Sequence, residues 1–321
     1  MKTHALLWAG LLLLASPASA QPQYPDRPVR IVVGNAPGGG TDIAARLIAQ
    51  KLSQNWGQSV IVENKPGASG TIGADLVAKA PPDGHTLLLS PQTSTAIAAA
   101  TTRSLPYDVV KDFTPISVVA SVPTVLVAGP ALPAGDFPAF MRYAKQHGQT
   151  LSFGSGGQAS TQHLAGEMLN LALGTRMQHV PYKGENPGIV DVIGGQLPLM
   201  FVTLSTALPH LRTGKVRALG LASLGRSSAA PDIPTIAESG LPGFEMAPWY
   251  GLFGPAGLPS AVTARIHADL VKVLAQPDVR EQFARNGFEL IGSTPAEAAA
   301  YLQSELAKYR RLVKDAGIES Q

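Results

Sequence analysis

Two short glycine-rich stretches carry the residues best suited to binding an anion. The first glycine stretch, residues 35–42, stands between an apolar run and a helix-like pattern, and the second, residues 155–161, repeats this arrangement. The start of a helix leaves backbone N–H groups unpaired and carries partial positive charge, and glycine lets a ligand approach that backbone closely. Each stretch therefore indicates a binding site for a carboxylate or phosphate group.

Other chemistries fit these residues less well. The nucleotide-binding fingerprints G-x-G-x-x-G and G-x-x-x-x-G-K-[ST] are both absent from the sequence. A hydrolase would need a G-x-S-x-G elbow, but Phe153 stands where its first glycine belongs. A secreted hydrolase that uses Ser155 is kept as the alternative hypothesis, and His163 is interpreted as a first-turn helix residue. No H-E-x-x-H motif, cysteine cluster or paired-histidine spacing predicts a metal, so we expect no metal and no cofactor.

The elements that must position these stretches alternate between strand-like and helix-like patterns. Residues 29–33, 59–63 and 85–89 are short apolar runs separated by helical patterns, which favours a parallel sheet covered by helices. In open sheets of this kind, ligands bind beyond the carboxyl ends of the strands. Two such loops, one in each of two domains, would face each other across a cleft and hold one carboxylate from both sides.

The length of 321 residues suggests two domains. Two long β-rich runs, residues 116–128 and 249–254, are interpreted as crossings between the domains. A return near residues 222–225 is the alternative for the second crossing. Two amphipathic helices are expected at the C-terminus, the second opening with a capping box at residues 294–297. The expected division is 21–121 plus 249–321 for domain 1 and 122–248 for domain 2.

Residues 1–20 have the pattern of a secretory signal peptide, with an apolar run and a small-x-small sequence that ends at Ala20. We expect cleavage after about Ala20 and export to the periplasm, since the apolar run is too short to span a bilayer. The chain has 25 Lys and Arg, 22 Asp and Glu, and no cysteine, so disulfides are excluded. No basic run marks a nucleic-acid surface, so nucleic acid is not expected as a partner.

Three polar residues lie near the expected cleft, and two of them have two interpretations. Asp42 is interpreted as a helix-start residue that fixes the loop, with contact to a ligand hydroxyl or amine as the alternative. Lys183 is the cation of a strand-end loop in domain 2, and it is either solvated or a ligand contact. Tyr182 is interpreted as a packing residue with its hydroxyl at the cleft rim.

A series of short motifs runs through nearly the whole length that follows the expected signal peptide. They are Tyr-Pro-Asp-Arg-Pro at 24–28, Pro-Gly-Gly-Gly-Thr-Asp at 37–42, Glu-Asn-Lys-Pro-Gly at 63–67, Pro-Asp-Gly at 82–84, Leu-Pro-Tyr-Asp at 105–108, Lys-Asp-Phe at 111–113, His-Leu-Ala-Gly-Glu at 163–167, Val-Pro-Tyr-Lys-Gly at 180–184, Asp-Ile-Pro-Thr at 232–235, Gly-Leu-Pro-Gly-Phe at 240–244 and Pro-Ala-Gly at 255–257. In this order they resemble the periplasmic substrate-binding receptors of tripartite tricarboxylate transporters, the Bug-type receptors.

The resemblance implies an α/β, two-domain type II periplasmic-binding-protein fold with a hinge and an interdomain ligand cleft. It implies a receptor, not an enzyme, that passes a small organic carboxylate (a di-, tri- or aromatic carboxylic acid) to a membrane transporter or a sensor ectodomain. In this family the two glycine stretches hold the carboxylate, partly through water. The ligand-binding residues expected from these motifs and from the strand ends are Asn35, Ala36, Gly38, Gly39, Gly40, Thr41, Asp42, Ser90, Gln92, Thr93, Ser155, Gly156, Gly157, Ser160, Thr161, Tyr182, Lys183, Val202 and Thr203.

Residues 200–203 depart from the family pattern, because Val202 stands where Asp is frequent after Met-Phe. An apolar Val202 removes one partner for an amine or hydroxyl, which favours a ligand with a less polar distal group, such as an aromatic or short aliphatic acid. Apart from a receptor and a hydrolase, the third hypothesis is a scaffold whose function is protein–protein contact.

Overall fold

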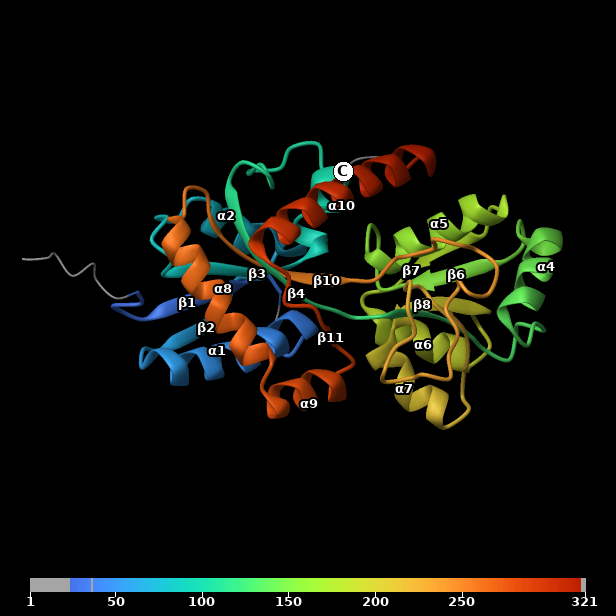
Figure 1. Ribbon diagram of the computed structural model, residues 1–321. Helices are drawn as coiled ribbons and strands as arrows, with labels where there is room; N and C mark the ends of the chain where they lie inside the picture. Colours follow the sequence, from blue (N-terminus) through green and yellow to red (C-terminus); the bar gives the residue numbers. More distant parts are fainter. Residues whose placement is uncertain (1–23, 36, 319–321) are drawn as a thin grey trace, which may run out of the picture.

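The computed structural model describes residues 24–35 and 37–318, which form two α/β lobes lying side by side (Figure 1). Each lobe is built around its own sheet, and the chain crosses between the lobes twice. The expected signal peptide and Ala36 of the first glycine stretch lie outside the described residues.

The first lobe contains a six-stranded sheet with the strand order β11-β4-β10-β3-β1-β2. β1 pairs in parallel with both β2 and β3, whereas β10 runs antiparallel to β3 and β4. The expectation of a parallel sheet is confirmed for β1 to β3, the strands from which it was drawn. β10 adds an antiparallel strand, because it arrives from the other lobe without a helical crossover inside this sheet. The strands are β1 (Val29–Val33), β2 (Val60–Asn64), β3 (Thr86–Pro91), β4 (Phe113–Ser121), β10 (Trp249–Pro255) and β11 (Glu289–Leu290).

Helices cover both faces of this sheet, and β1 shows why. Ile31 and Val33 pack with α1 and α8, while Val32 packs with α2 and α10, because successive side chains of a strand point to opposite faces. The helices of this lobe are α1 (Gly40–Trp56), α2 (Thr71–Ala78), α3 (Ala98–Thr101), α8 (Ser260–Leu274), α9 (Pro277–Arg285) and α10 (Pro295–Asp315), with the 3₁₀ turns η1 (Ala68–Gly70) and η2 (Gln92–Ser94).

The second lobe contains a five-stranded sheet with the order β7-β6-β8-β5-β9. β6 is parallel to β7 and β8, whereas β5 is antiparallel to β8 and β9. Helices α4 and α5 contribute to the apolar cluster on one face, and α6 and α7 to that on the other. The elements are β5 (Thr124–Ala128), α4 (Phe137–His147), β6 (Ser152–Ser155), α5 (Thr161–Leu173), β7 (Gln178–Pro181), α6 (Glu185–Ile193), β8 (Leu199–Thr203), α7 (Leu204–Arg212) and β9 (Arg217–Leu221).

Both crossings lie between strands of different sheets. β4 ends at Ser121 in the first sheet, and β5 begins at Thr124 in the second. After β9, the chain stays on the second lobe, where Phe244 stacks on Phe201 with ring centroids 6.4 Å apart, before β10 begins at Trp249. We therefore use "first lobe" for residues 24–121 and 249–318 and "second lobe" for residues 122–248.

The C-terminal region contains three helices where two were expected. The additional helix, α9, has nine residues and buries Val279 and Phe283, which is too short a pattern to stand out in the sequence. The capping box at the start of α10 is confirmed, since Thr294 and Glu297 bond reciprocally. α10 extends from the first lobe to contact α5 of the second (Figure 1).

Candidate ligand-binding site

The first glycine stretch connects β1 to α1 and is held by Asp42 in the first turn of that helix. The Asp42 carboxylate accepts hydrogen bonds from Gly38 N–H, Arg46 Nε and Asn64 Nδ2, each at 2.9 Å. Burial alone would raise the pKa of this carboxyl, but these hydrogen bonds, the one from Arg46 above all, hold it at about 2. The carboxylate is thus engaged with the loop and its helix, which supports the interpretation of Asp42 as the residue that fixes the loop.

The second glycine stretch connects β6 to α5 and rests on two histidines. Ser160 caps α5 by accepting from His163 N–H at 3.2 Å, and His163 Nδ1 accepts from Ala159 N–H at 3.1 Å. His179 Nε2 lies 2.7 Å from Ser155 Oγ at the end of β6. These contacts fix both ends of the loop that leads into the first turn of α5.

The two imidazoles stack on each other with ring centroids 3.8 Å apart. Burial lowers the pKa of His163 to about 4, and burial together with the neighbouring His163 lowers that of His179 to about 3. The Glu167 carboxylate lies 3.7 Å from His163 Nε2, but the loss of hydration outweighs it. Both imidazoles are therefore neutral at pH 7, and the second glycine stretch rests on uncharged partners.

Gln92 and Thr161 join the two lobes at the cleft. Gln92 begins η2 just beyond β3, Thr161 is the first residue of α5, and Gln92 Nε2 donates to Thr161 Oγ1 at 3.0 Å. Both side chains are buried. Gln92 Oε1 is buried without a hydrogen-bond partner among the described residues. The hydroxyl of Thr161 can donate as well as accept. The side-chain amide of Gln92 can therefore also be oriented with Oε1 accepting from Thr161, which leaves its N–H groups free.

The second glycine stretch and residues that follow β1 and β3 border one cavity of about 470 Å³ between the lobes. Its walls include five of the expected residues: Asn35 and Thr93 from the first lobe, and Gly156, Gly157 and Ser160 from the second. The described residues that line it are all uncharged. A cavity of this size suits a small molecule, and its donors are hydroxyls, amides and backbone N–H groups rather than guanidinium groups.

Several expected residues lie near this cavity without lining it. Gly38 and Gly39 precede α1, and Gly40 and Thr41 are its first residues; a Cβ atom on Gly40 would lie 2.7 Å from the hydroxyl of Tyr250. Tyr182 donates to Asp191 at 2.7 Å, and burial and this carboxylate raise the pKa of Tyr182 to about 12. The side chain of Lys183 is exposed.

Ser90 and Val202 are corrections to the expected site. Ser90 is fully buried, and its Oγ lies 2.6 Å from Ser94 Oγ. Val202 is also fully buried and packs with Met200 in the apolar cluster against α6 and α7. Alternate residues of a strand face opposite sides of the sheet, so the side chain of Val202 points into this core and not towards the cavity.

Two polar residues near the cavity were not expected from the sequence. Glu185, the first residue of α6, accepts from Thr203 N–H at 3.1 Å, from Thr203 Oγ1 at 2.7 Å and from Gln162 Nε2 at 2.5 Å. Tyr250 of β10 is buried, and burial followed by the charge of Glu185 raises the pKa of its hydroxyl. In the sequence Glu185 resembles any acidic residue at a helix start, and Tyr250 resembles a core residue of an apolar strand. The turn at residues 68–71, which also lines the cavity, was missed as well.

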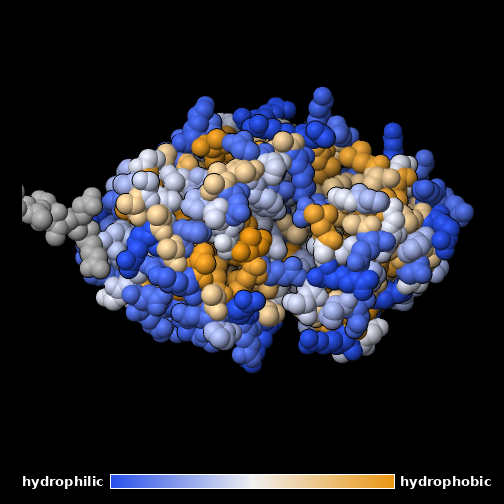
Figure 2. All heavy atoms as spheres, viewed as in Figure 1, coloured by the Kyte–Doolittle hydropathy of each residue, from blue (hydrophilic) through white to orange (hydrophobic). Residues whose placement is uncertain are grey.

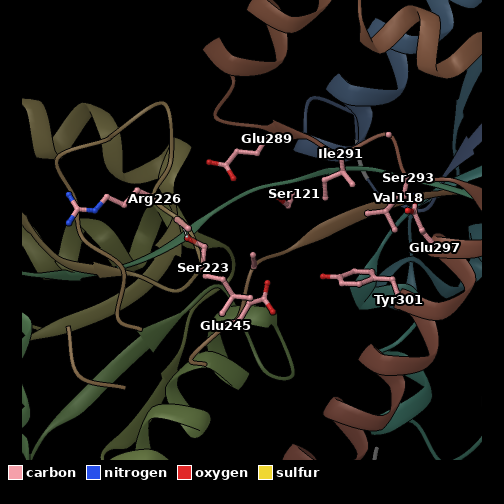
Figure 3. Close-up of a pocket in the computed structure, with 14 residues that line it drawn as sticks. Val118, Ser121, Ser223, Arg226, Glu245, Glu289, Ile291, Ser293, Glu297 and Tyr301 are labelled. Carbon is pink, nitrogen blue, oxygen red and sulfur yellow. Dashed lines mark hydrogen bonds between the residues drawn. The ribbon is translucent and has the colours of Figure 1, made fainter. Parts of the chain in front are cut away.

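A larger cavity, about 570 Å³, lies beside the two crossings (Figure 3). Three carboxylates line it, those of Glu245, Glu289 and Glu297. Arg226 also lines it, but its guanidinium group pairs with Glu238 at 2.9 Å. This concentration of negative charge disfavours an anionic ligand, so the smaller cavity between the lobes is the candidate site.

The contact between Ser155 and His179 resembles a nucleophile and base pair. Ser155 is, however, fully buried, and its Oγ donates to the Gly157 carbonyl at 2.9 Å. Among the described residues, no carboxylate is hydrogen-bonded to His179 to orient it as a triad would require. The pair therefore serves as a support for the loop.

Over residues 24–35 and 37–318, no group of three or more His, Cys, Asp or Glu side chains is arranged to hold a metal ion. Within the same ranges, no helix has the length and apolar character needed to cross a membrane.

Two α/β lobes with a small-molecule cavity between them define a binding protein of the periplasmic, type II class. The chain belongs to the tripartite tricarboxylate transporter family receptors, whose family model matches residues 44–318. A structure of the periplasmic binding protein BugD is 35% identical, with a TM-score of 0.76 over 93% of this chain and 100% of that chain.

Two further structures contain ligands. One, from R. palustris with adipate, is 33% identical, with a TM-score of 0.79 over 92% of this chain and 99% of that chain. The other, MatC from Rhodopseudomonas palustris with bound malate, is 35% identical, with a TM-score of 0.76 over 90% of this chain and 100% of that chain. The family is one of solute-binding receptors.

Proposed function

We propose that this protein captures a small organic carboxylate in the cavity between its lobes and delivers it to a membrane transporter. The observation that carries the proposal is an uncharged cavity whose walls come from both lobes and include Ser160, the residue that caps the start of α5. Helix starts offer free backbone N–H groups and partial positive charge, which suit a carboxylate without requiring arginine.

Two relatives support a carboxylate as the ligand, because their structures hold adipate and malate. Export follows from the signal-like residues 1–20, with cleavage after about Ala20, and delivery to transporter subunits follows from the family. Binding would close the lobes by a hinge motion without covalent chemistry. A hydrolase remains the second candidate, because Ser155 lies within hydrogen-bond distance of His179.

The test is a thermal-shift and calorimetric screen of mono-, di- and tricarboxylates and aromatic acids. A ligand present at 100 times its dissociation constant adds about 2.7 kcal/mol of apparent stability. Thr93→Phe should abolish that shift, because Thr93 lines the cavity and is half-buried, so the added ring would occupy the space of the ligand. Thr213→Phe is the matched control, since Thr213 is exposed at the end of α7 in the second lobe.

Stabilisation by no carboxylate, or equal stabilisation of the two variants, would refute the proposal. Turnover of an ester panel that is lost in Ser155→Ala would instead favour the hydrolase.

A further inference from the structure

A fixed negative charge, that of Glu185, lies directly behind the second glycine stretch, although Glu185 itself does not line the cavity. Both oxygens of Glu185 are occupied: Oε1 accepts from Gln162 Nε2 and from Thr203 N–H, and Oε2 accepts from Thr203 Oγ1. Among the described residues, no Lys, Arg or His forms an ion pair with this carboxylate. Three neutral donors thus hold the carboxylate in one position without neutralising its charge.

Its location is defined from both lobes. A Cβ atom on Gly156, which lines the cavity, would lie 3.4 Å from Cγ of Glu185. From the first lobe, the hydroxyl of Tyr250 lies against Gly40 at the start of α1, and its pKa is raised in part by the charge of Glu185. Glu185 therefore lies beside the second glycine stretch, at one side of the candidate site.

The two charges of the site differ in sign. The start of α5 carries partial positive charge, whereas Glu185, held by Gln162 of that same helix, carries a full negative charge. A ligand that is anionic at one end and cationic at the other would pair with both of these charges. A second carboxylate near Glu185 would meet a like charge, which disfavours its binding.

We propose that Glu185 is a specificity-determining residue that makes this cleft select carboxylates bearing an amino group over dicarboxylates. This inference rests on the proposed function, and it narrows the class of ligand. It also differs from the expectation drawn from Val202, since a carboxylate of α6 is bonded to Thr203, the last residue of β8.

The experiment compares matched four-carbon ligands: butanoate, 2-aminobutanoate, 4-aminobutanoate and butanedioate. Their dissociation constants are measured by calorimetry on the full mature chain and on Glu185→Gln, which keeps the size of the side chain and removes its charge. Glu281→Gln is the control, because Glu281 is exposed on α9 and the net charge changes equally. Thermal unfolding without ligand confirms that each variant is folded.

The wild type should bind one of the amino acids more tightly than butanedioate. Glu185→Gln should lower that ratio of affinities by about ten-fold or more, and Glu281→Gln should leave it unchanged. A wild type that prefers butanedioate, or a ratio that is the same in Glu185→Gln, overturns the role of Glu185 while leaving a carboxylate receptor intact. Failure of all four ligands, together with failure of the wider carboxylate screen, overturns the proposed function itself.

Discussion

Replacing the two stacked histidines is expected to remove most of the pH dependence of stability between pH 7.5 and 5.5. His163 Nδ1 accepts from Ala159 N–H, so protonation of this nitrogen would replace a hydrogen bond with two opposed donors. His179 lies on the same stack, 3.8 Å from His163, so a charge on one ring disfavours a charge on the other. The variant is His163→Asn with His179→Gln, because the Asn oxygen can accept in place of His163 Nδ1 and the Gln amide can bond to Ser155 Oγ in place of His179 Nε2.

The sign of the pH dependence of stability follows from the direction of both pKa shifts. The pKa values of about 4 and about 3 in the folded protein lie below the unfolded value of about 6.5, so the unfolded chain binds more protons at intermediate pH. Stability is complete above about pH 6.5 and is lost as the pH falls towards the folded values. Between pH 7.5 and 5.5 the loss is about 1.4 kcal/mol for each histidine, or about 2.7 kcal/mol for both.

The assay is urea unfolding at pH 5.5, 6.5 and 7.5 with the free energy of unfolding extrapolated to water. Asp42, whose pKa is about 2, titrates below this window and does not contribute. His147→Asn is the control, because His147 is exposed at the end of α4 and should leave the slope intact. A double variant that keeps the wild-type slope would refute the conclusion that both rings are neutral in the folded protein.

Two further predictions concern the cleft and the first loop. Gln92→Leu removes the hydrogen bond to Thr161 and should weaken binding of a carboxylate found in the screen by about five- to ten-fold, while Gln54→Leu, an exposed control on α1, should not. Asp42→Ala leaves Gly38 N–H without its acceptor and Asn64 Nδ2 with the Asn35 carbonyl alone, and it should cost about 1–3 kcal/mol of stability. Calorimetry tests the first and urea unfolding the second; unchanged values would contradict them.

The class of fold could be predicted from the sequence, because local patterns specify its strands, turns and helices. Apolar runs followed by a glycine-rich turn and a helix appear at β1 and β6, and the capping box at Thr294 marks the start of α10. Strand direction at β10 could not be predicted in the same way, since it depends on how the chain returns from the other lobe. Short α9 was missed because it has only two buried residues.

The parts of the candidate site that are formed by backbone could be predicted from the sequence. The parts that are formed by side chains were less predictable. Gly156, Gly157 and Ser160 line the cavity because a glycine-rich turn before a helix has few alternatives. The orientation of Val202 depends on which face of β8 meets α6, which the tetrapeptide around it does not specify. Glu185 approaches Thr203 only after α6 has packed against β8, so no spacing in the sequence relates the two.

The contacts between the lobes differ on the two sides of their junction. We expect this difference to make closure of the cleft dependent on the ligand. Beside the crossings, an apolar cluster continues from Leu126 of the second lobe to Trp249 of the first, and α10 packs on α5. Across the cleft, the side-chain hydrogen bond among the described residues is that between Gln92 and Thr161. One hydrogen bond contributes about 1 kcal/mol, which favours a closed state only about five-fold. A carboxylate at 100 times its dissociation constant contributes about 2.7 kcal/mol, a further 100-fold. Opening should therefore occur at the cleft, with the apolar side as the pivot and the ligand deciding which state prevails.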